Sequence, residues 1–324
     1  MEQFEKIRTG LRPELRAMNE IITDTLRTGN EMMNGIVTTY LEKKGKQIRP
    51  ILVILSAKMF GEVNDDVLHA GAALEMLHNA SLIHDDVVDE TTLRRGEPTI
   101  NRLWGNQVAV LVGDYFVSNA LAAGIKTGHL SIISALSALG KELSLGEIDQ
   151  ITNARDHHFD ESSYFMVIRK KTASLFMHCV KMGAEAVNAS PEEMGPMVTY
   201  AELLGLCFQI KDDIFDYYDN PQIGKPTGND LREGKVTLPL LYALNHADED
   251  DAEAMRSLIE RGDLTTEEIN SLIEFAKREG GVDYAFDVMR KMQQEANTII
   301  DRYPDSESKE AFKEIFEFII SRDK

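Results

Sequence analysis

Residues 69–89 read HAGAALEMLHNASLIHDDVVD, and residues 197–218 read MVTYAELLGLCFQIKDDIFDYY. Both stretches are apolar on almost every side until their last turns, which predicts two helices buried in the core of the protein. Each stretch then ends in an Asp-Asp-x-x-Asp cluster. The first cluster is Asp85, Asp86 and Asp89, and the second is Asp212, Asp213 and Asp216.

The position of these carboxylates calls for a cation. A helix carries partial negative charge at its C-terminal end, so aspartates are unfavourable there, and like charges one turn apart repel each other. Asp85 and Asp89 share one helix face, and Asp212 and Asp216 repeat that spacing. Hard carboxylate oxygens in small number suit Mg²⁺. One acidic helix end is usually solvated surface, but two clusters of identical spacing favour a metal site.

Helix signals run through the rest of the chain, and the strict alternation typical of strands is absent, so we expect an all-α fold without a sheet. Asp160, Ser190 with Glu193, and Thr265 with Glu268 are expected to cap helix starts. No Pro- or Gly-rich stretch divides residues 1–324, so we expect a single domain. The expected helices cover residues 2–27, 30–43, 47–60, 65–90, 107–125, 129–154, 161–187, 191–218, 235–246, 251–261, 265–278, 281–302 and 306–321.

Composition excludes several classes of function. The formal net charge is −19, which argues against nucleic acid and against anionic membrane surfaces as partners. Cys179 and Cys207 are the two cysteines, and both lie in apolar runs, as expected of buried free thiols in a reducing compartment. We find neither a signal-peptide core nor an apolar run long enough to cross a membrane, and we therefore expect a cytoplasmic protein.

Basic and polar residues near the clusters could hold phosphate groups. They lie in the segments KGKQIRP (44–50), RRG (94–96), RKKTASLF (169–176) and GKPTGNDLREGK (224–235). Arg can form paired bonds to phosphate oxygens, and Lys acts as a point charge. His78 precedes Asp85 by two helical turns, and Gln209 precedes Asp216 by the same distance, so each shares a face with its cluster.

These motifs resemble the trans-isoprenyl diphosphate synthase family, over about residues 40–245. Within it the chain looks most like the bacterial long-chain polyprenyl (octaprenyl-type) synthases that make quinone side chains. The motifs that carry the resemblance are LIHDDVVDETTLRRGEPT (82–99), GDYFVSNAL (113–121), GEIDQ (146–150), RKKTASLF (169–176), FQIKDDIFDYY (208–218) and GKPTGNDLREGKVTLPLLYAL (224–244).

The resemblance implies an isoprenoid synthase fold, which is a bundle of antiparallel helices around a central cavity, and usually a homodimer. The two clusters would face each other across the cavity mouth. Asp85, Asp89 and Asp212 would bind Mg²⁺, supported by Asp86, Asp213 and Asp216. Isopentenyl diphosphate would be held by Lys46, Arg49, His78 and Arg95. The allylic diphosphate would be held by Arg94, Lys171, Thr172, Gln209, Lys225 and Lys235, of which Arg94, Lys171 and Lys225 would also offset charge on the leaving group.

The family usually has Gly-Gly-Lys-Arg-x-Arg-Pro where this chain has KGKQIRP. Lys44 replaces a glycine and Gln47 replaces an arginine, while the phosphate-contacting Lys46 and Arg49 are kept. The assignment of Lys46 and Arg49 to phosphate binding therefore stands.

Product length is expected to depend on the helix that carries the first cluster. Leu77, Ala80 and Ser81 lie eight, five and four residues before Asp85, which is roughly 6–12 Å deeper along a helix. In the family, a bulky aromatic side chain at the last two of these positions stops growth early. Small side chains here predict an open tunnel and a long product.

Four other readings remain open. A geranylgeranyl or farnesyl diphosphate synthase would share every catalytic motif. A class I terpene cyclase would normally lack the second Asp-Asp-x-x-Asp cluster and the isopentenyl-binding residues. A metal phosphohydrolase could use His84 and Asp85 but would need further histidine ligands. A non-catalytic subunit of a two-component synthase would have lost the aspartate clusters, which this chain keeps.

Overall fold

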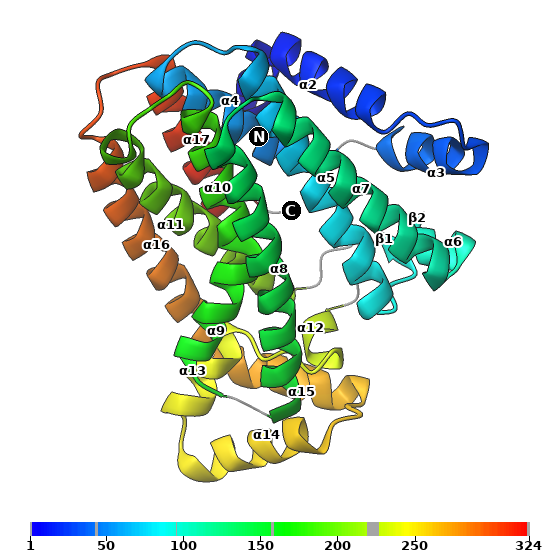
Figure 1. Cartoon of the computed structure of the whole chain (residues 1–324). Helices are drawn as coiled ribbons and strands as arrows, with labels where there is room; N and C mark the ends of the chain where they lie inside the picture. The colour runs from blue at the N-terminus through cyan, green and yellow to red at the C-terminus, as the bar shows by residue number, and fades with distance from the viewer. Residues whose placement is uncertain (1, 43–44, 95, 157–158, 219–226, 323–324) are drawn as a thin grey trace. The chain divides into compact units, whose positions relative to one another are not determined.

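The computed structural model describes residues 2–42, 45–94, 96–156, 159–218 and 227–322. It confirms the all-α class (Figure 1). In the described residues, β structure is limited to an antiparallel pair, β1 (Leu93–Arg94) and β2 (Glu97–Pro98). The expectation of no sheet was therefore wrong only for this two-residue ladder, which is too short to show alternation in sequence.

The chain forms two compact units, each described here by itself. Unit 1 contains Met1–Lys141, Leu175–Thr199 and Tyr303–Ile315, and unit 2 contains Glu142–Ser174, Tyr200–Arg302 and Phe316–Lys324. The first aspartate cluster belongs to unit 1 and the second to unit 2. The single-domain assignment stays a prediction.

Unit 1 is built around the first of the two apolar helices, α5. Helices α2, α4 and α7 all pack against α5, and Figure 1 shows α5 and α7 side by side. Leu74 and Met76 at its centre are fully buried, as its all-round apolar character predicted. The helices whose bounds lie within this unit are α1 (Glu2–Gly10), α2 (Arg12–Thr25), α3 (Glu31–Glu42), α4 (Ile48–Phe60), α5 (Asp65–Val88), α6 (Ile100–Trp104) and α7 (Asn106–Lys126).

Unit 2 contains the C-terminal half of the second apolar helix, α11, and within this unit α13 packs against α15 and α16. The elements within this unit are α9 (Glu161–Ile168), the π-helix η1 (Arg169–Ala173), α12 (Asn229–Arg232), α13 (Leu238–His246), α14 (Glu249–Arg261), α15 (Thr266–Arg278) and α16 (Gly281–Ile300). Four unit boundaries fall inside helices, and the fifth lies between Arg302 and Tyr303, after α16. The four divided helices are α8 (Leu130–Asp156), α10 (Ser174–Glu185), α11 (Pro191–Phe215) and α17 (Glu307–Ser321).

The predicted caps are present. Asp160 accepts from the backbone N–H of Ser163 at 2.8 Å, and Thr265 forms a complete capping box with Glu268. Ser190 and Glu193 bond each other reciprocally between side chains and backbone amides. These side chains satisfy amide groups that a helix start leaves open, which explains why α9, α15 and α11 begin where they do.

The predicted helix ends agree with the structure to within about three residues, but the helices differ from expectation in three larger respects. The predicted helix 2–27 is divided at Leu11, next to Pro13 in the first turn of α2, since proline cannot donate to the helical ladder. The predicted helix 161–187 is interrupted by η1, whose wider turn has no signature in residue periodicity. The short helices α6 and α12 were missed because so few residues show no helical period.

Helix α7 is long and apolar enough to cross a membrane, judged by length and composition. Of its most apolar segment, 39% is buried in the structure. Core helices of globular proteins meet the same criterion, so the expectation that no segment spans a membrane stays a prediction. Cys179 and Cys207 are buried free thiols, as expected.

Candidate active site

The first aspartate cluster lies at the end of α5, where Asp89 is the C-cap residue. Asp86 is turned inward, with a side chain only 6% exposed. Its Oδ1 accepts from Arg94 Nε at 2.9 Å and lies 2.8 Å from Arg94 Nη2. Burial is the largest single influence and opposes charge on Arg94, but the hydrogen bond to Asp86 and the nearby negative charges together outweigh it, so the pKa of the guanidinium is raised. Arg94 therefore neutralises the buried carboxylate, while Asp85 and Asp89 are more open to solvent.

His84, next to the cluster, is turned toward α7. Its Nε2 lies 3.2 Å from the carbonyl oxygen of Val110 and 3.5 Å from Asp114 Oδ1. A Cβ on Gly113 would come within 2.2 Å of the same nitrogen, so glycine is needed there for α5 and α7 to approach. This contact gives His84 a packing role and counts against the phosphohydrolase reading.

The other expected phosphate ligands of unit 1 lie on α4, α5 and the loop before α4. Lys46 is exposed, Arg49 is half-buried with its guanidinium 5.8 Å from the Phe176 ring centre, and His78 is 5% exposed. Gln47, which replaces the usual arginine, adopts a left-handed conformation with φ 57° immediately before α4. Arg95 and Lys44 lie outside the described residues.

In the second cluster every carboxylate has a donor from the protein. Asp212 Oδ1 accepts from Arg322 Nη2 at 2.6 Å. Asp216 accepts from the backbone amides of Asn229 and Asp230 at 2.9 and 3.0 Å, and so caps the start of α12.

Asp213 is the buried member of this cluster. Its Oδ2 accepts from the Tyr164 hydroxyl at 2.6 Å and its Oδ1 from Gln209 Nε2 at 2.8 Å. Burial, and next the charge of Asp230, raise the pKa of Asp213 to about 8, although the two hydrogen bonds act in the opposite direction. Burial, and next the charge of Asp213, raise the pKa of Tyr164 well above its ordinary value.

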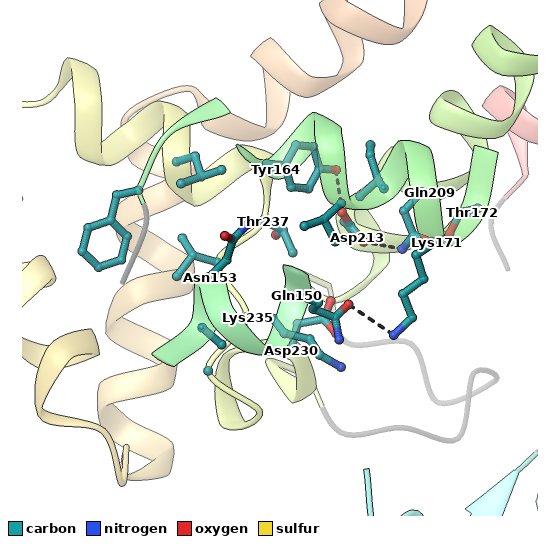
Figure 2. Close-up of a pocket in the computed structure, with 17 residues that line it drawn as sticks. Gln150, Asn153, Tyr164, Lys171, Thr172, Gln209, Asp213, Asp230, Lys235 and Thr237 are labelled. Carbon is teal, nitrogen blue, oxygen red and sulfur yellow. Dashed lines mark hydrogen bonds between the residues drawn. The ribbon is translucent and has the colours of Figure 1, made fainter. Parts of the chain in front are cut away.

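A cavity of about 190 Å³ opens beside Asp213 within unit 2 (Figure 2). Lys171, Thr172, Gln209 and Lys235 line it together with Asp213, so the structure brings five sequence-selected residues to one place. Phe159, Val167, Ile168 and Leu241 add apolar lining. Lys225 lies outside the described residues. The cavity thus combines cations, hydroxyl and amide groups, and a hydrocarbon wall.

The GEIDQ motif on α8 positions the basic motif on η1. Lys171 Nζ lies 2.5 Å from Glu147 Oε2 and donates to Gln150 Oε1 at 3.3 Å, while Lys170 binds Asp149 at 2.6 Å. A Cβ on Gly146 would come within 2.9 Å of the Lys171 backbone nitrogen. Glycine at this position therefore lets α8 approach the π-helix.

Sequence reasoning missed four residues of this region. Tyr164 and Asp230 line the cavity, Glu147 binds Lys171, and Arg322 binds Asp212. Glu147 and Asp230 lie inside motifs that were quoted, so a search for carboxylates beside the cationic motifs could have found them. Tyr164 and Arg322 have no local signal, because their partners are distant in sequence.

The donor chemistry of both clusters fits a divalent metal. In the part of the chain that the structure describes, no three His, Cys, Asp or Glu side chains already surround a common metal position. Asp85, Asp89 and Asp212 nevertheless offer carboxylate oxygens that are at least partly accessible, whereas Asp86 and Asp213 are buried and occupied by protein donors. A few hard oxygen ligands, completed by water and phosphate, are what Mg²⁺ uses.

Comparison with known proteins identifies the family. The polyprenyl synthetase family model matches residues 30–276. Octaprenyl diphosphate synthase of Haemophilus influenzae is 33% identical over 300 residues, covering 92% of this chain and 91% of the relative. A geranylgeranyl pyrophosphate synthase from Bacteroides thetaiotaomicron superposes with a TM-score of 0.86 at 37% identity, covering 99% and 100% of the two chains.

A third similar structure is a polyprenyl synthase from Caulobacter crescentus, complexed with calcium and isoprenyl diphosphate. It has a TM-score of 0.92 and 28% identity and covers 99% of this chain and 98% of its own. The chain belongs to the polyprenyl synthetase family and is a prenyl-transferring enzyme of the isoprenoid synthase fold.

Proposed function

We propose that the protein is an all-trans long-chain polyprenyl diphosphate synthase of octaprenyl type. It condenses isopentenyl diphosphate onto an allylic diphosphate such as farnesyl diphosphate, and its product supplies a quinone side chain. The observation that carries the proposal is the cavity beside the second cluster, where Lys171 and Lys235 accompany Asp213 and an apolar wall. The names of its relatives support the same class of substrates.

The chain's own residues would divide the reaction between them. Lys171, held by Glu147, is fixed where it can offset charge on the leaving diphosphate, with Arg94 and Lys225 in the same role, while Lys235 helps to hold the allylic diphosphate. Lys46, Arg49, His78 and Arg95 hold isopentenyl diphosphate so that its alkene attacks the allylic cation. The apolar lining keeps water from that cation. Loss of a proton then completes a chain longer by one isoprene unit, with the released pyrophosphate as the base.

Asp85, Asp89 and Asp212 are the residues that would hold Mg²⁺ on the allylic diphosphate. When bound, the metal supplies Lewis-acid stabilisation of the departing diphosphate. The calcium in the Caulobacter crescentus synthase complex supports a divalent cation in this family. Asp86 and Asp213 are better suited to hold the helix ends in place, because Arg94, Tyr164 and Gln209 already occupy them.

A long product is favoured by the small side chains below the first cluster. Ala80 is 1% exposed and Leu77 is 8% exposed on α5, and Ser81 is half-buried, so none of these three positions itself carries an aromatic ring. The alternative is a shorter product, and the 37% identity to a geranylgeranyl pyrophosphate synthase favours it. A class I terpene cyclase is less well supported, since both aspartate clusters are complete.

We further propose a cytoplasmic homodimer. Leu111, Leu121 and Ile125 are exposed apolar residues on one face of α7, at 63%, 40% and 66%, with Asp114 and Ser118 between the first two, and Leu130 at the start of α8 is 82% exposed. An apolar surface of this kind, formed on one helix face, is typical of an interface between protein chains. A second copy related by a two-fold axis would cover it.

The product would be delivered to a membrane.

Product analysis tests the proposal. The protein is incubated with radiolabelled isopentenyl diphosphate, farnesyl diphosphate and Mg²⁺, and the products are separated by chain length. We expect incorporation into chains well beyond geranylgeranyl length. Accumulation of geranylgeranyl diphosphate would favour the alternative, and absence of incorporation would refute both.

A further inference from the structure

A chain of three hydrogen bonds runs along one wall of the cavity in unit 2. Thr172 Oγ1 donates to Gln209 Oε1 at 2.6 Å, and Gln209 Nε2 donates to Asp213 Oδ1 at 2.8 Å. The Tyr164 hydroxyl donates to Asp213 Oδ2 at 2.6 Å. All four residues line the cavity, and Figure 2 shows Tyr164 and Gln209 converging on Asp213. These three hydrogen bonds therefore connect α9, η1 and α11 at the site.

The direction of these bonds follows from the chemistry of the groups. An ionised carboxylate can only accept, so the side of Gln209 that faces Asp213 is its amide nitrogen. The carbonyl oxygen of Gln209 then faces Thr172, which uses its one hydroxyl proton there. If Asp213 instead carried a proton on Oδ2, Oδ1 would still accept from Gln209. In both cases Gln209 Oε1 and Thr172 Oγ1 have only lone pairs left for other groups.

Tyr164 lies at one end of this series of hydrogen bonds and is connected to Gln209 only through Asp213. Its side chain is 8% exposed, and its ring packs edge-on against Phe165 at 5.3 Å, so its hydroxyl is held in one place. Without that hydroxyl, Asp213 would lose the donor on Oδ2, and its side chain could rotate away from Gln209. The Gln209 amide, no longer donating to a carboxylate, could then turn over and present N–H groups where it now presents oxygen.

We propose that Tyr164 is a positioning residue for prenyl transfer: through Asp213 it fixes the Gln209 amide, so that oxygen lone pairs face the allylic cation. Fixed dipoles aimed at developing charge are a strong source of catalysis, and an amide turned the other way would oppose the cation. The inference rests on the proposed function, because it requires a cation in this cavity. Tyr164 itself needs no contact with the substrate.

Two analogues of farnesyl diphosphate test this role without turnover. One carries sulfur in place of the bridging oxygen and stays neutral at the reacting carbon; the other carries a protonated amine at that position. Their affinities are measured by calorimetry in the presence of Mg²⁺. We expect Tyr164→Phe to weaken binding of the ammonium analogue about tenfold and to change binding of the neutral analogue less than about twofold.

Tyr217→Phe is the matched control. Tyr217 is also a buried tyrosine of unit 2, but its hydroxyl bonds the hydroxyl of Thr237 at 3.0 Å and is not hydrogen-bonded to Asp213. It should leave the ratio of the two affinities unchanged. In a Gln209→Leu background, Tyr164→Phe should cause no further loss, because there is no amide left to orient. Equal weakening of both analogues, or an added loss in that background, would overturn the inference.

Asp213→Asn is the second variant, for use if Tyr164→Phe does not fold. Asparagine can accept from Gln209 and donate to the Tyr164 oxygen, so the affinity ratio should stay within about twofold of wild type. Loss of the ratio in this variant would contradict the account. A wild-type protein that elongates farnesyl diphosphate while Tyr164→Phe keeps the ratio refutes only this inference. A wild type that neither elongates nor binds either analogue refutes the proposed function as well.

Discussion

The second aspartate of each cluster differs from its neighbours in the same way. Asp86 and Asp213 are both buried, and each is bound by side-chain donors of its own unit, Arg94 in one case and Tyr164 with Gln209 in the other. The outer aspartates are more open to solvent. Residue type alone does not distinguish the six carboxylates, and only the family resemblance divided them into metal ligands and supporting residues. Helix geometry separates them, since successive residues point about 100° apart and only one of two neighbours can face the core.

The buried carboxyl of Asp213 gives a pH dependence in the metal-free protein. Its pKa is about 8 when folded, against an ordinary value of about 3.9, so the folded state keeps a proton that the unfolded chain releases. The stabilisation that the folded protein gains from the protonated Asp213 carboxyl is therefore present at low pH and is lost as the pH rises from about 4 to 8. Urea unfolding with EDTA, at pH 5 and pH 8, should show a smaller pH dependence in Asp213→Asn than in wild type. An equal dependence in both proteins would show that this carboxyl is not the source.

Ser81→Phe tests the origin of product length. Ser81 is half-buried on α5, where its hydroxyl donates to the carbonyl of His78 at 2.9 Å. A phenyl ring placed four residues before Asp85 would fill the space into which a growing chain extends. We expect shorter products with isopentenyl diphosphate still consumed, as measured by chromatography of the labelled chains. Ser271→Phe, on the exposed face of α15, should leave product length unchanged. Unaltered products from Ser81→Phe would mean that the chain grows elsewhere.

At the scale of elements, Arg322 anchors the end of α17 to α11. Its side chain is 7% exposed, it bonds Asp212 and the carbonyl oxygen of Phe208, and its guanidinium lies 4.3 Å from the Phe208 ring centre. Arg322→Gln should lower the free energy of unfolding of the metal-free protein by about 1–3 kcal/mol, because it removes the donor of a part-buried carboxylate. Urea unfolding measures the change.

Arg290→Gln is the control for this prediction. Arg290 pairs with Asp287 on the surface of α16 and is 62% exposed, so its loss should cost less than about 0.5 kcal/mol. Equal, small effects of the two substitutions would show that Arg322 does not anchor α17.

Several elements could be read from the sequence and others could not. The apolar helices α5 and α11 were predicted because residues apolar all round a helix have few other places to go. Caps at Asp160 and Thr265 followed from side-chain chemistry alone. The π-helix η1 could not be predicted, because it depends on contacts with α8 at Gly146 and on the ion pair between Lys171 and Glu147. Those contacts join residues 24 and 25 positions apart in the chain, which periodicity does not report.

At the scale of the whole molecule, the exposed apolar residues Leu111, Leu121 and Ile125 on α7 predict self-association. Replacing Leu111 and Ile125 together by Lys would place two charges on a face that we propose is covered by a second copy. We expect the wild type to run as a dimer and the double variant as a monomer in light scattering after size-exclusion chromatography. Met32→Lys, on an exposed apolar residue of α3, should stay dimeric. A monomeric wild type would contradict the proposal.

The central claim is that the first aspartate cluster takes part in metal-assisted prenyl transfer. The most direct test is the initial rate of isopentenyl diphosphate incorporation into farnesyl diphosphate by Asp85→Ala, at saturating Mg²⁺. Asp24→Ala, at an aspartate 70% exposed on α2, is the control. We expect the rate for Asp85→Ala to be at least about a thousandfold below wild type, with the helical circular dichroism unchanged. The rate for Asp24→Ala should equal that of wild type. A rate for Asp85→Ala close to that of wild type would contradict the central claim.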